Sequence, residues 1–331
     1  MRAIVLNGHG GPDVLELRDV PDPVPGPDEV LVDVTATALN RADLLQRIGL
    51  YPGPPMEHEI PGMEFSGHVA ALGERVRSVA VGTPVMGIVG GGSYAERLVT
   101  HERMLIRIPD RIPVEDAAAI PEVFITAFDA LVAQGGLTPG RVALVHAGAS
   151  GVGTAAIQIA RAIGARVVVT ASTDKVEACR ELGADLAVDY RNDDFVSAVR
   201  SFTGGAGVDV VLDVIGGDYV GRNIDCLATN GHIIQVGLMG GGVAEVNVGS
   251  LLAKRASITG TTLRARPLEE KVAISRRFAT ELLAFFEDGR LRPVIDRRYP
   301  LAEVADAHRH MEANANVGKI LLSARSPLPE G

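Results

Sequence analysis

The clearest chemical signal in the sequence is a glycine-rich turn at residues 148–153, directly after the apolar run 142–147 and before a helix predicted over 154–163. Glycine at the first and last positions permits a tight turn and close packing of the helix on the strand. Backbone N–H groups at the start of that helix would face a pyrophosphate. Ser150 replaces the second glycine of the usual G-x-G-x-x-G pattern, and its hydroxyl could donate to a phosphate. The turn predicts dinucleotide contacts from Gly148, Ser150, Gly151, Val152 and Gly153, and the alternative is a turn that binds no ligand.

The nucleotide is selected where the second strand of such a fold ends, because an NAD-preferring protein places a carboxylate against the ribose there. Residues 167–170 lead into Ser172, so no acid stands at this strand end. Asp174 is better placed to cap or begin the next helix. A 2′-phosphate would meet Ser172, Lys175, Tyr190 and Arg191, which favours NADPH. The alternatives are that Lys175 and Arg191 are solvated surface charges and that Asp174 reaches the ribose, which would favour NADH.

The chain around this turn alternates strands and helices, which is typical of a doubly wound parallel α/β sheet. Six strands are predicted, at residues 142–147, 166–170, 185–189, 208–214, 232–237 and 257–261. Residues up to about 111 instead show short apolar runs broken by proline and glycine, which indicates a mostly β domain. After Gly289, a strand at 293–299, a helix at 301–313 and a strand at 319–323 do not extend the alternation. We expect this last segment to return to the first domain.

Composition limits the kinds of protein this chain can be. Its 331 residues suit about two domains. Lysine and arginine total 32, and aspartate and glutamate total 41, so the net charge is −9 and no nucleic-acid partner is expected. The uncharged stretch between Arg141 and Arg161 is interrupted by glycine, serine and glutamine, and is not expected to cross a membrane. Cys179 and Cys226 are the only cysteines, which favours a reducing compartment and therefore the cytoplasm.

Several motifs occur in the order found in one enzyme family. They are ALNRAD at residues 38–43, PGMEFSGHV at 61–69, AIPE at 119–122, the glycine turn, GLMGGG at 237–242 and MEANANVGKI at 311–320. With them the sequence resembles the zinc-independent quinone oxidoreductases of the medium-chain dehydrogenase/reductase superfamily, most of all the p53-inducible quinone oxidoreductase group. The resemblance covers nearly the whole chain. It implies a GroES-like, mostly β catalytic domain from residues 1–118 and 290–331, a Rossmann domain over 119–289, an active site in the cleft between them, and a homodimer.

The resemblance also implies that no zinc is bound. Zinc-dependent members hold the metal with Cys, His and Cys or Asp, whereas Asn40 and Met63 stand at the positions of the first Cys and the His. Both cysteines fall in the nucleotide domain, so neither a thiolate nor an imidazole is left at those positions to bind zinc. We expect Glu64 to form structural hydrogen bonds and His68 to be an ordinary strand residue.

The same resemblance assigns Tyr51, Asn40 and Asp43 to the catalytic site. The Tyr51 phenol would hydrogen-bond the oxyanion that develops on the acceptor. Asn40 would do likewise or orient the nicotinamide ribose, and Asp43 would fix Asn40 or Arg41. The alternative for Asn40 and Asp43 is that they cap a short helix. The alternative for Tyr51 is a loop aromatic packed on proline.

Further nucleotide contacts are implied outside the glycine turn. Thr126 matches the position under the nicotinamide ring, with a back-bonded or solvent-facing helical threonine as the alternative. Asn223 would contact the adenosine side or be a surface helix residue. Asn316 and Lys319 would close the site, with the ammonium on a phosphate or at a strand edge. The end of the fifth strand, where cofactors lie in such folds, is formed by Gly237, Leu238, Met239 and Gly240, unless these form only a surface loop.

Together these residues predict a metal-free, NADPH-dependent quinone oxidoreductase that transfers hydride to a quinone in the interdomain cleft. Without a Lewis acid an alkoxide is hard to form, so alcohol oxidation is disfavoured. A quinone is itself an electrophile and needs mainly to be held against the nicotinamide, away from water. Two alternatives remain. One is reduction of an activated alkene in an enone or enoyl substrate, and the other is a non-catalytic NADPH-binding protein.

Overall fold

The computed structural model describes residues 1–324. The chain divides into two compact units: unit 1 comprises Met1–Glu122 and Arg264–Gly331, and unit 2 comprises Val123–Leu263. The second division thus falls after Leu263, whereas the sequence suggested a division near residue 289. The reason is that helix α9 (Leu268–Glu287) packs in unit 1 against strand β7 (Ile106–Arg107). Residues 325–331 of the predicted catalytic domain lie outside the described residues.

Unit 2 is built on one six-stranded parallel sheet. Its strands are β8 (Val142–Val145), β9 (Arg166–Ala171), β10 (Leu186–Asp189), β11 (Val208–Asp213), β12 (Leu227–Gln235) and β13 (Ser257–Gly260). They lie in the order β10-β9-β8-β11-β12-β13, which is the 3-2-1-4-5-6 order of a dinucleotide-binding sheet. All six predicted strands are confirmed, although β12 begins at Leu227, earlier than its apolar run indicates. Strands β8, β9 and β11 are rich in buried valine, as expected for a parallel sheet covered on both faces.

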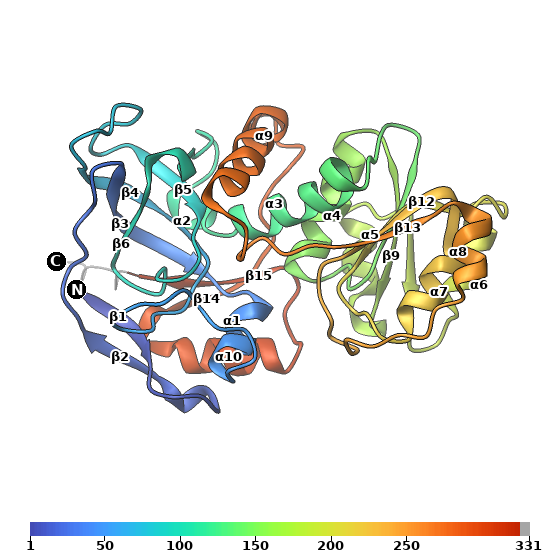
Figure 1. The fold of residues 1–331 in the computed structure, drawn as a ribbon, viewed down its shortest axis with the longest axis horizontal. Coiled ribbons are helices and arrows are strands. Elements are labelled where there is room, and N and C mark those ends of the chain that lie inside the picture. The colour runs from blue at the N-terminus through green and yellow to red at the C-terminus, as the bar shows by residue number, and fades with distance from the viewer. Residues whose placement is uncertain (325–331) are drawn as a thin grey trace. The chain divides into compact units, whose positions relative to one another are not determined.

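Helices cover both sides of this sheet (Figure 1). They are α4 (Gly151–Ala162), α5 (Val176–Glu181), α6 (Phe195–Phe202), α7 (Tyr219–Cys226) and α8 (Val248–Lys254), with a 3₁₀ turn at Thr173–Lys175. Helix α3 (Pro121–Phe128) begins in unit 1 and continues into a π-helical turn at Asp129–Gln134, which contacts β11 and β12. Helices α4 and α5 pack against β8, β9 and β10, and α7 and α8 pack against β12. The uncharged stretch between Arg141 and Arg161 is therefore a strand, a turn and a helix, as predicted.

Unit 1 is mostly β, as predicted for the N-terminal part of the chain. Its main sheet contains β3 (Glu29–Ala38), β4 (Glu64–Leu72), β5 (Pro84–Ile88), β6 (Arg97–His101), β7, β14 (Ile295–Pro300) and β15 (Lys319–Ser323), and a two-stranded sheet pairs β1 (Arg2–Leu6) with β2 (Leu15–Asp19). Strand β15 pairs antiparallel with β3, where Leu321 lies beside Ala38, so the C-terminal strands do return to the first domain. Buried valines of β3 pack with Phe65 and Leu98 in the core.

The helices of unit 1 are few and short apart from α9. They are α1 (Arg41–Arg47), α2 (Val114–Ala117) and α10 (Val304–Glu312), with 3₁₀ turns at Pro12–Val14, Glu102–Met104 and Leu301–Glu303. Helix α1 follows β3 with only Leu39 and Asn40 between them. Of the three predicted catalytic residues, Asn40 lies in this junction and Asp43 lies in the first turn of α1.

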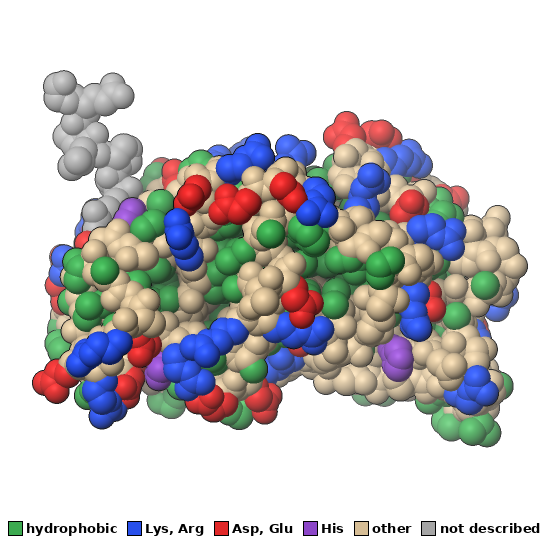
Figure 2. Space-filling view, turned by 90° about the horizontal axis from the view of Figure 1, so that it is seen from above, with side chains coloured by type: hydrophobic (Ala, Val, Ile, Leu, Met, Phe, Trp, Pro, Cys, Tyr) green, Lys and Arg blue, Asp and Glu red, His purple; other side chains and the backbone are tan. Residues whose placement is uncertain are grey.

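The surface of the molecule carries charges of both signs. On the face shown in Figure 2, acidic and basic side chains lie interspersed. No helix within residues 1–324 is long and apolar enough to cross a membrane. Cys179 and Cys226 are both free and buried.

Candidate active site

In unit 2, the turn between β8 and α4 leaves room for glycine alone at two positions. A Cβ atom on Gly153 would lie 2.3 Å from the carbonyl oxygen of Ala147, and a Cβ atom on Gly148 would lie 2.7 Å from the Cβ of Val169. Ala147 itself adopts φ = 55°, which residues with a side chain seldom take. The left-handed residue of the turn is therefore Ala147, whereas Gly148 is needed because the neighbouring strand is so close.

The start of α4 presents hydrogen-bond donors that suit a pyrophosphate. The Ser150 Oγ is the N-cap and accepts from the backbone N–H of Gly153 at 3.0 Å, which leaves the hydroxyl hydrogen free to donate. The N–H groups of Gly151 and Val152 have no acceptor among the described residues, as is usual in a first helical turn. These donors, at the positive end of a 12-residue helix, form a ready anion site. The turn therefore fits NADPH or NADH at the residues predicted for it.

The four residues predicted for a 2′-phosphate gather at the ends of β9 and β10. These strands are neighbours in the sheet, and the N–H of Tyr190 donates to the Ala171 carbonyl at 3.2 Å. Arg191 lies 3.8 Å from Asp174, whose pKa is lowered first by a hydrogen bond from Ser172. The ends of β9 and β10 thus bring together Ser172, Lys175, Tyr190 and Arg191, and the carboxylates of Asp174 and Asp189 lie beside them.

The loop after β12 is fixed at the carboxyl edge of the sheet. The N–H of Met239 donates to the Val214 carbonyl at 3.1 Å, and the N–H of Gly240 donates to the Ile215 carbonyl at 2.7 Å. The side chains of Leu238 and Met239 are more than half exposed. This loop, which also includes Gly237, is thus held by backbone hydrogen bonds to the segment after β11.

Thr126, the residue predicted to lie under the nicotinamide ring, is on α3 and has a partly exposed side chain.

Asn223 requires a correction, because it is neither a surface residue nor free for a nucleotide. Its side chain is completely buried in α7. The carbonyl oxygen lies 2.7 Å from Nε2 of His146, and the amide donates to Asp213 at 2.9 Å. His146 in turn contacts the Thr170 hydroxyl at 3.0 Å. Asn223 therefore joins β8, β9 and β11 from inside the unit.

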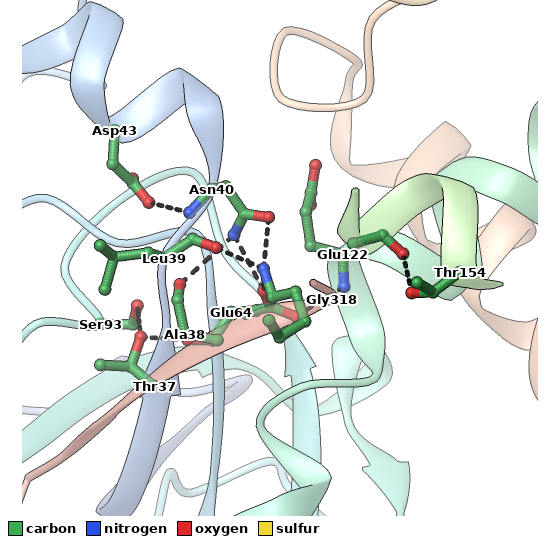
Figure 3. A network of polar contacts seen from close by, with 12 residues as sticks. Thr37, Ala38, Leu39, Asn40, Asp43, Glu64, Ser93, Glu122, Thr154 and Gly318 are labelled. Carbon is green, nitrogen blue, oxygen red and sulfur yellow. Dashed lines mark hydrogen bonds and ion pairs between the residues drawn. The ribbon is translucent and has the colours of Figure 1, made fainter. Parts of the chain in front are cut away.

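In unit 1, Asn40 is part of a buried charged cluster with Glu64 and Lys319. Figure 3 shows Asn40 and Glu64 in this cluster. The Asn40 amide donates to Glu64 at 2.8 Å, and its carbonyl oxygen accepts from Lys319 at 2.7 Å. Lys319 and Glu64 form an ion pair at 2.8 Å. The second Glu64 oxygen accepts from the backbone N–H of Glu122 at 2.8 Å. The expected structural role of Glu64 is confirmed by these bonds.

Lys319 is also corrected by this cluster. Its side chain is 3% exposed, and its three ammonium donors go to Asn40, Glu64 and the Leu39 carbonyl. No donor is left for a cofactor phosphate. Asn316, which is likewise buried, donates to the Gly318 carbonyl at 2.7 Å and shapes the turn before β15. Both side chains therefore form hydrogen bonds inside unit 1.

Asp43 takes the capping role that was the alternative to a catalytic one. Its carboxylate accepts from the backbone N–H of Asn40 at 2.8 Å and from the Tyr94 hydroxyl at 3.0 Å. Burial raises the pKa of Asp43 to about 6, partly offset by these hydrogen bonds. Its other oxygen, Oδ1, is buried without a partner in the described residues. Asp43 thus fixes the entry of α1 and, through it, the backbone of Asn40.

Tyr51 stands apart from that cluster, in the loop after α1. Its ring lies under the guanidinium of Arg264, 5.1 Å from the ring centre, and its carbonyl accepts from the same side chain at 3.3 Å. Arg264 also bonds Gln46 at 2.7 Å. The ring is half-buried, which raises the pKa of the phenol, and its hydroxyl has no hydrogen-bond partner within residues 1–324. The hydroxyl is therefore available to a ligand.

Sequence reasoning missed Arg264 and Glu122. Arg264 lies far from Tyr51 in sequence and carries no motif, so only the fold reveals that it clamps the loop. Glu122 occurs in the AIPE motif, where an acid in the first turn of a helix is unremarkable on electrostatic grounds. Its neighbours Glu64 and Lys319 could not be inferred from spacing.

The side chains around Asn40 do not fit a zinc ion. Asn40 offers an amide already bonded on both sides, and Met63 offers a buried thioether, a poor ligand for zinc. The Glu64 carboxylate is paired with an ammonium, and His68 is exposed on β4. Within residues 1–324, no group of three His, Cys, Asp or Glu side chains is arranged to hold a metal.

The sheet order and glycine turn of unit 2, together with the mostly antiparallel β sheet of unit 1, define the class of two-domain dinucleotide-fold oxidoreductases. Residues 26–110 match the alcohol dehydrogenase GroES-like domain, and residues 151–279 match the zinc-binding dehydrogenase family model. The chain belongs to the medium-chain dehydrogenase/reductase superfamily.

Its relatives differ in their described roles. The chain is 34% identical to a rat synaptic vesicle membrane protein VAT-1 homolog, over 97% of this chain and 84% of the relative. It is also 34% identical to a quinone oxidoreductase of Lama guanicoe, over 97% of each chain. Among solved structures, the Escherichia coli quinone oxidoreductase complexed with NADPH superposes with a TM-score of 0.88 at 30% identity, over 98% of this chain and 100% of that one. An NAD-dependent alcohol dehydrogenase superposes with a TM-score of 0.85 at 35% identity, over 98% and 99%.

Proposed function

We propose that this protein is a metal-independent, NADPH-dependent quinone oxidoreductase. The observation that carries the proposal is the buried cluster of Asn40, Glu64 and Lys319, in which an ammonium rather than a metal neutralises the carboxylate. Such a site has no Lewis acid with which to form an alkoxide, so it suits an acceptor that is already electrophilic. The similarity to quinone oxidoreductases, one of them complexed with NADPH, supports the same choice of acceptor and nucleotide.

The glycine turn would hold the pyrophosphate of NADPH through Ser150, Gly151 and Val152. Lys175 and Arg191 would meet the 2′-phosphate. When bound, the nicotinamide supplies a hydride. The exposed loop from Gly237 to Gly240 and the side chain of Thr126 are proposed to position the nicotinamide.

The Tyr51 hydroxyl is proposed to donate a hydrogen bond to the oxygen of the acceptor that becomes negative as hydride arrives. Its suitability rests on two properties. The phenol has no other partner among the described residues, and Arg264 holds its loop in place. Because burial raises the pKa of Tyr51, the phenol keeps its proton at neutral pH and acts as a donor.

The test is the loss of reduced-nicotinamide absorbance with chelator-treated protein, using NADPH and NADH in turn and a panel of quinones, enones and alcohols. Quinone-dependent oxidation of NADPH that persists after chelation is the expected result. Oxidation only with an enone would identify an alkene reductase instead. If NADPH binds but no acceptor is reduced, the protein is a nucleotide-binding protein and the proposal fails.

A further inference from the structure

Arg264 is a partly buried cation of unit 1 that is bonded to neutral oxygens. Its Nε donates to the Gly90 carbonyl at 2.6 Å, one terminal nitrogen donates to the Tyr51 carbonyl at 3.3 Å, and the other donates to the Gln46 side-chain oxygen at 2.7 Å. None of these acceptors is a carboxylate, so these bonds leave the positive charge of the guanidinium in place. Taking such a charge partly out of water costs free energy, so this arrangement calls for an explanation.

The guanidinium lies where three segments of unit 1 meet. One acceptor is on α1, one is in the loop after α1, and one is in the loop after β5. The two loops also pack closely on each other. A Cβ atom on Gly91 would lie 3.1 Å from Cδ of Pro54, and a Cβ atom on Gly92 would lie 3.0 Å from the terminal carbon of Met56. Arg264 therefore joins α1 and both loops through a single side chain.

Tyr51 is held by Arg264 at its backbone and at its ring. The guanidinium donates to the Tyr51 carbonyl, and its carbon lies 5.1 Å from the ring centre, which is a cation–π contact. The hydroxyl, in contrast, has no hydrogen-bond partner within residues 1–324. The position of the hydroxyl is therefore set by what holds the rest of the residue, and Arg264 supplies two of those contacts.

The charge of Arg264 acts on the same hydroxyl. Burial raises the pKa of Tyr51, the positive guanidinium acts in the opposite direction, and Glu122 raises the pKa further. A phenol that holds its proton less tightly donates a stronger hydrogen bond to an oxygen that becomes negative. The uncancelled charge of Arg264 thus has a use beside the Tyr51 ring.

Resting on the proposed function, we infer that Arg264 is a positioning residue of the reaction, which fixes the Tyr51 hydroxyl where it donates to the acceptor oxygen. Arg264 itself transfers no proton and no hydride, because it acts through the phenol. The role needs a planar group that bonds several oxygens while it lies against a ring. An ammonium cannot do both, so lysine is not an equivalent replacement.

The experiment is a double-mutant cycle on para-benzoquinone with Tyr51→Phe, Arg264→Lys and the double variant. We expect kcat/KM to fall about 100-fold in Tyr51→Phe and about tenfold in Arg264→Lys, mainly through kcat. In the Tyr51→Phe background, Arg264→Lys should cost no more than about twofold, because no hydroxyl is left to be positioned. Arg297→Lys, which removes a guanidinium 6.0 Å from the ring centre of Tyr299 elsewhere in unit 1, is the matched control and should keep the wild-type rate.

Losses that multiply in the double variant would mean that Arg264 acts independently of Tyr51, and the inference would be wrong. A wild-type rate in Tyr51→Phe would overturn it as well, since no role of the hydroxyl would remain.

A second measurement needs no substrate. In protein labelled with 3-fluorotyrosine, whose phenol is more acidic than that of tyrosine, the ¹⁹F resonance of Tyr51 is assigned by its absence in Tyr51→Phe. Arg264→Gln removes the cation, so the pKa of labelled Tyr51 should rise, whereas Arg297→Lys should leave it unchanged. An unshifted titration in Arg264→Gln contradicts the inference. If wild type reduces no quinone, the proposed function fails, and this titration still decides whether Arg264 controls the phenol.

Discussion

The two units stabilise their buried polar groups in different ways. Unit 1 buries an ion pair between Lys319 and Glu64, and the side-chain amide of Asn40 forms a hydrogen bond with each of them. Unit 2 buries an imidazole, His146, whose pKa is lowered by burial and which therefore stays neutral between a hydroxyl and the amide of Asn223. The anion site of unit 2 is made instead from backbone N–H groups at the start of α4. Unit 2 also buries a carboxylate, Asp213, but the donors to it are neutral: the Asn223 amide and the backbone N–H groups of Ile215 and Gly216. The two buried charges of the Lys319–Glu64 pair in unit 1 instead depend on each other.

The largest effect expected from this difference is that of Lys319→Met. The substitution leaves Glu64 as a buried carboxylate without its cation, and breaking such a pair costs about 3–5 kcal/mol. We expect the free energy of unfolding of unit 1 to drop by that order, measured by urea denaturation. Glu64→Gln in the Lys319→Met background removes the stranded charge and should restore part of the stability. A loss below about 1 kcal/mol in the single variant would show that the pair is not essential.

This contrast also explains what the sequence could predict. The nucleotide site of unit 2 is largely contiguous: a strand, a turn and a helix within residues 142–162 carry both the fold signal and the ligand contacts. The apolar runs that mark its strands are equally local, so the sheet followed from the pattern. The capping role of Asp43, three residues after Asn40, was also within reach of local reasoning.

The cluster of unit 1 is assembled from three distant segments, and no spacing rule connects Asn40, Glu64 and Lys319. Lys319 was assigned to a phosphate because its motif is near the C-terminus of similar enzymes, but on β15 its side chain points into the core. Asn223 was misjudged for a related reason, since an asparagine on a helix gives no sign that it faces a buried histidine. The direction of a side chain depends on packing that the sequence does not display.

A smaller effect tests the backbone-built site of unit 2. In Gly153→Ala the new methyl group would meet the Ala147 carbonyl at 2.3 Å and the Gly148 carbonyl at 2.5 Å, so the start of α4 must shift. Because the anion site consists of N–H groups on that turn, we expect NADPH affinity to fall at least tenfold, about 1.4 kcal/mol, by fluorescence titration. Gly260→Ala, where a Cβ would have no neighbour within 4 Å, is the control. Equal affinities for the two variants would place the nucleotide elsewhere.

The smallest effect on NADPH binding is expected for the buried network around Asn223, where stability and binding can be separated. Asn223→Ala leaves His146 and Asp213 each short of one buried hydrogen-bond partner, at a cost of about 1–3 kcal/mol in unfolding free energy. Because the Asn223 side chain has no exposed surface, the NADPH dissociation constant should stay within about twofold of wild type, well under the tenfold that 1.4 kcal/mol represents. Urea denaturation and titration of the same preparation give both values. Weaker NADPH binding at unchanged stability would restore the adenosine contact inferred from sequence. It would also mean that α7 moves when the nucleotide binds, because only such a movement could expose this side chain.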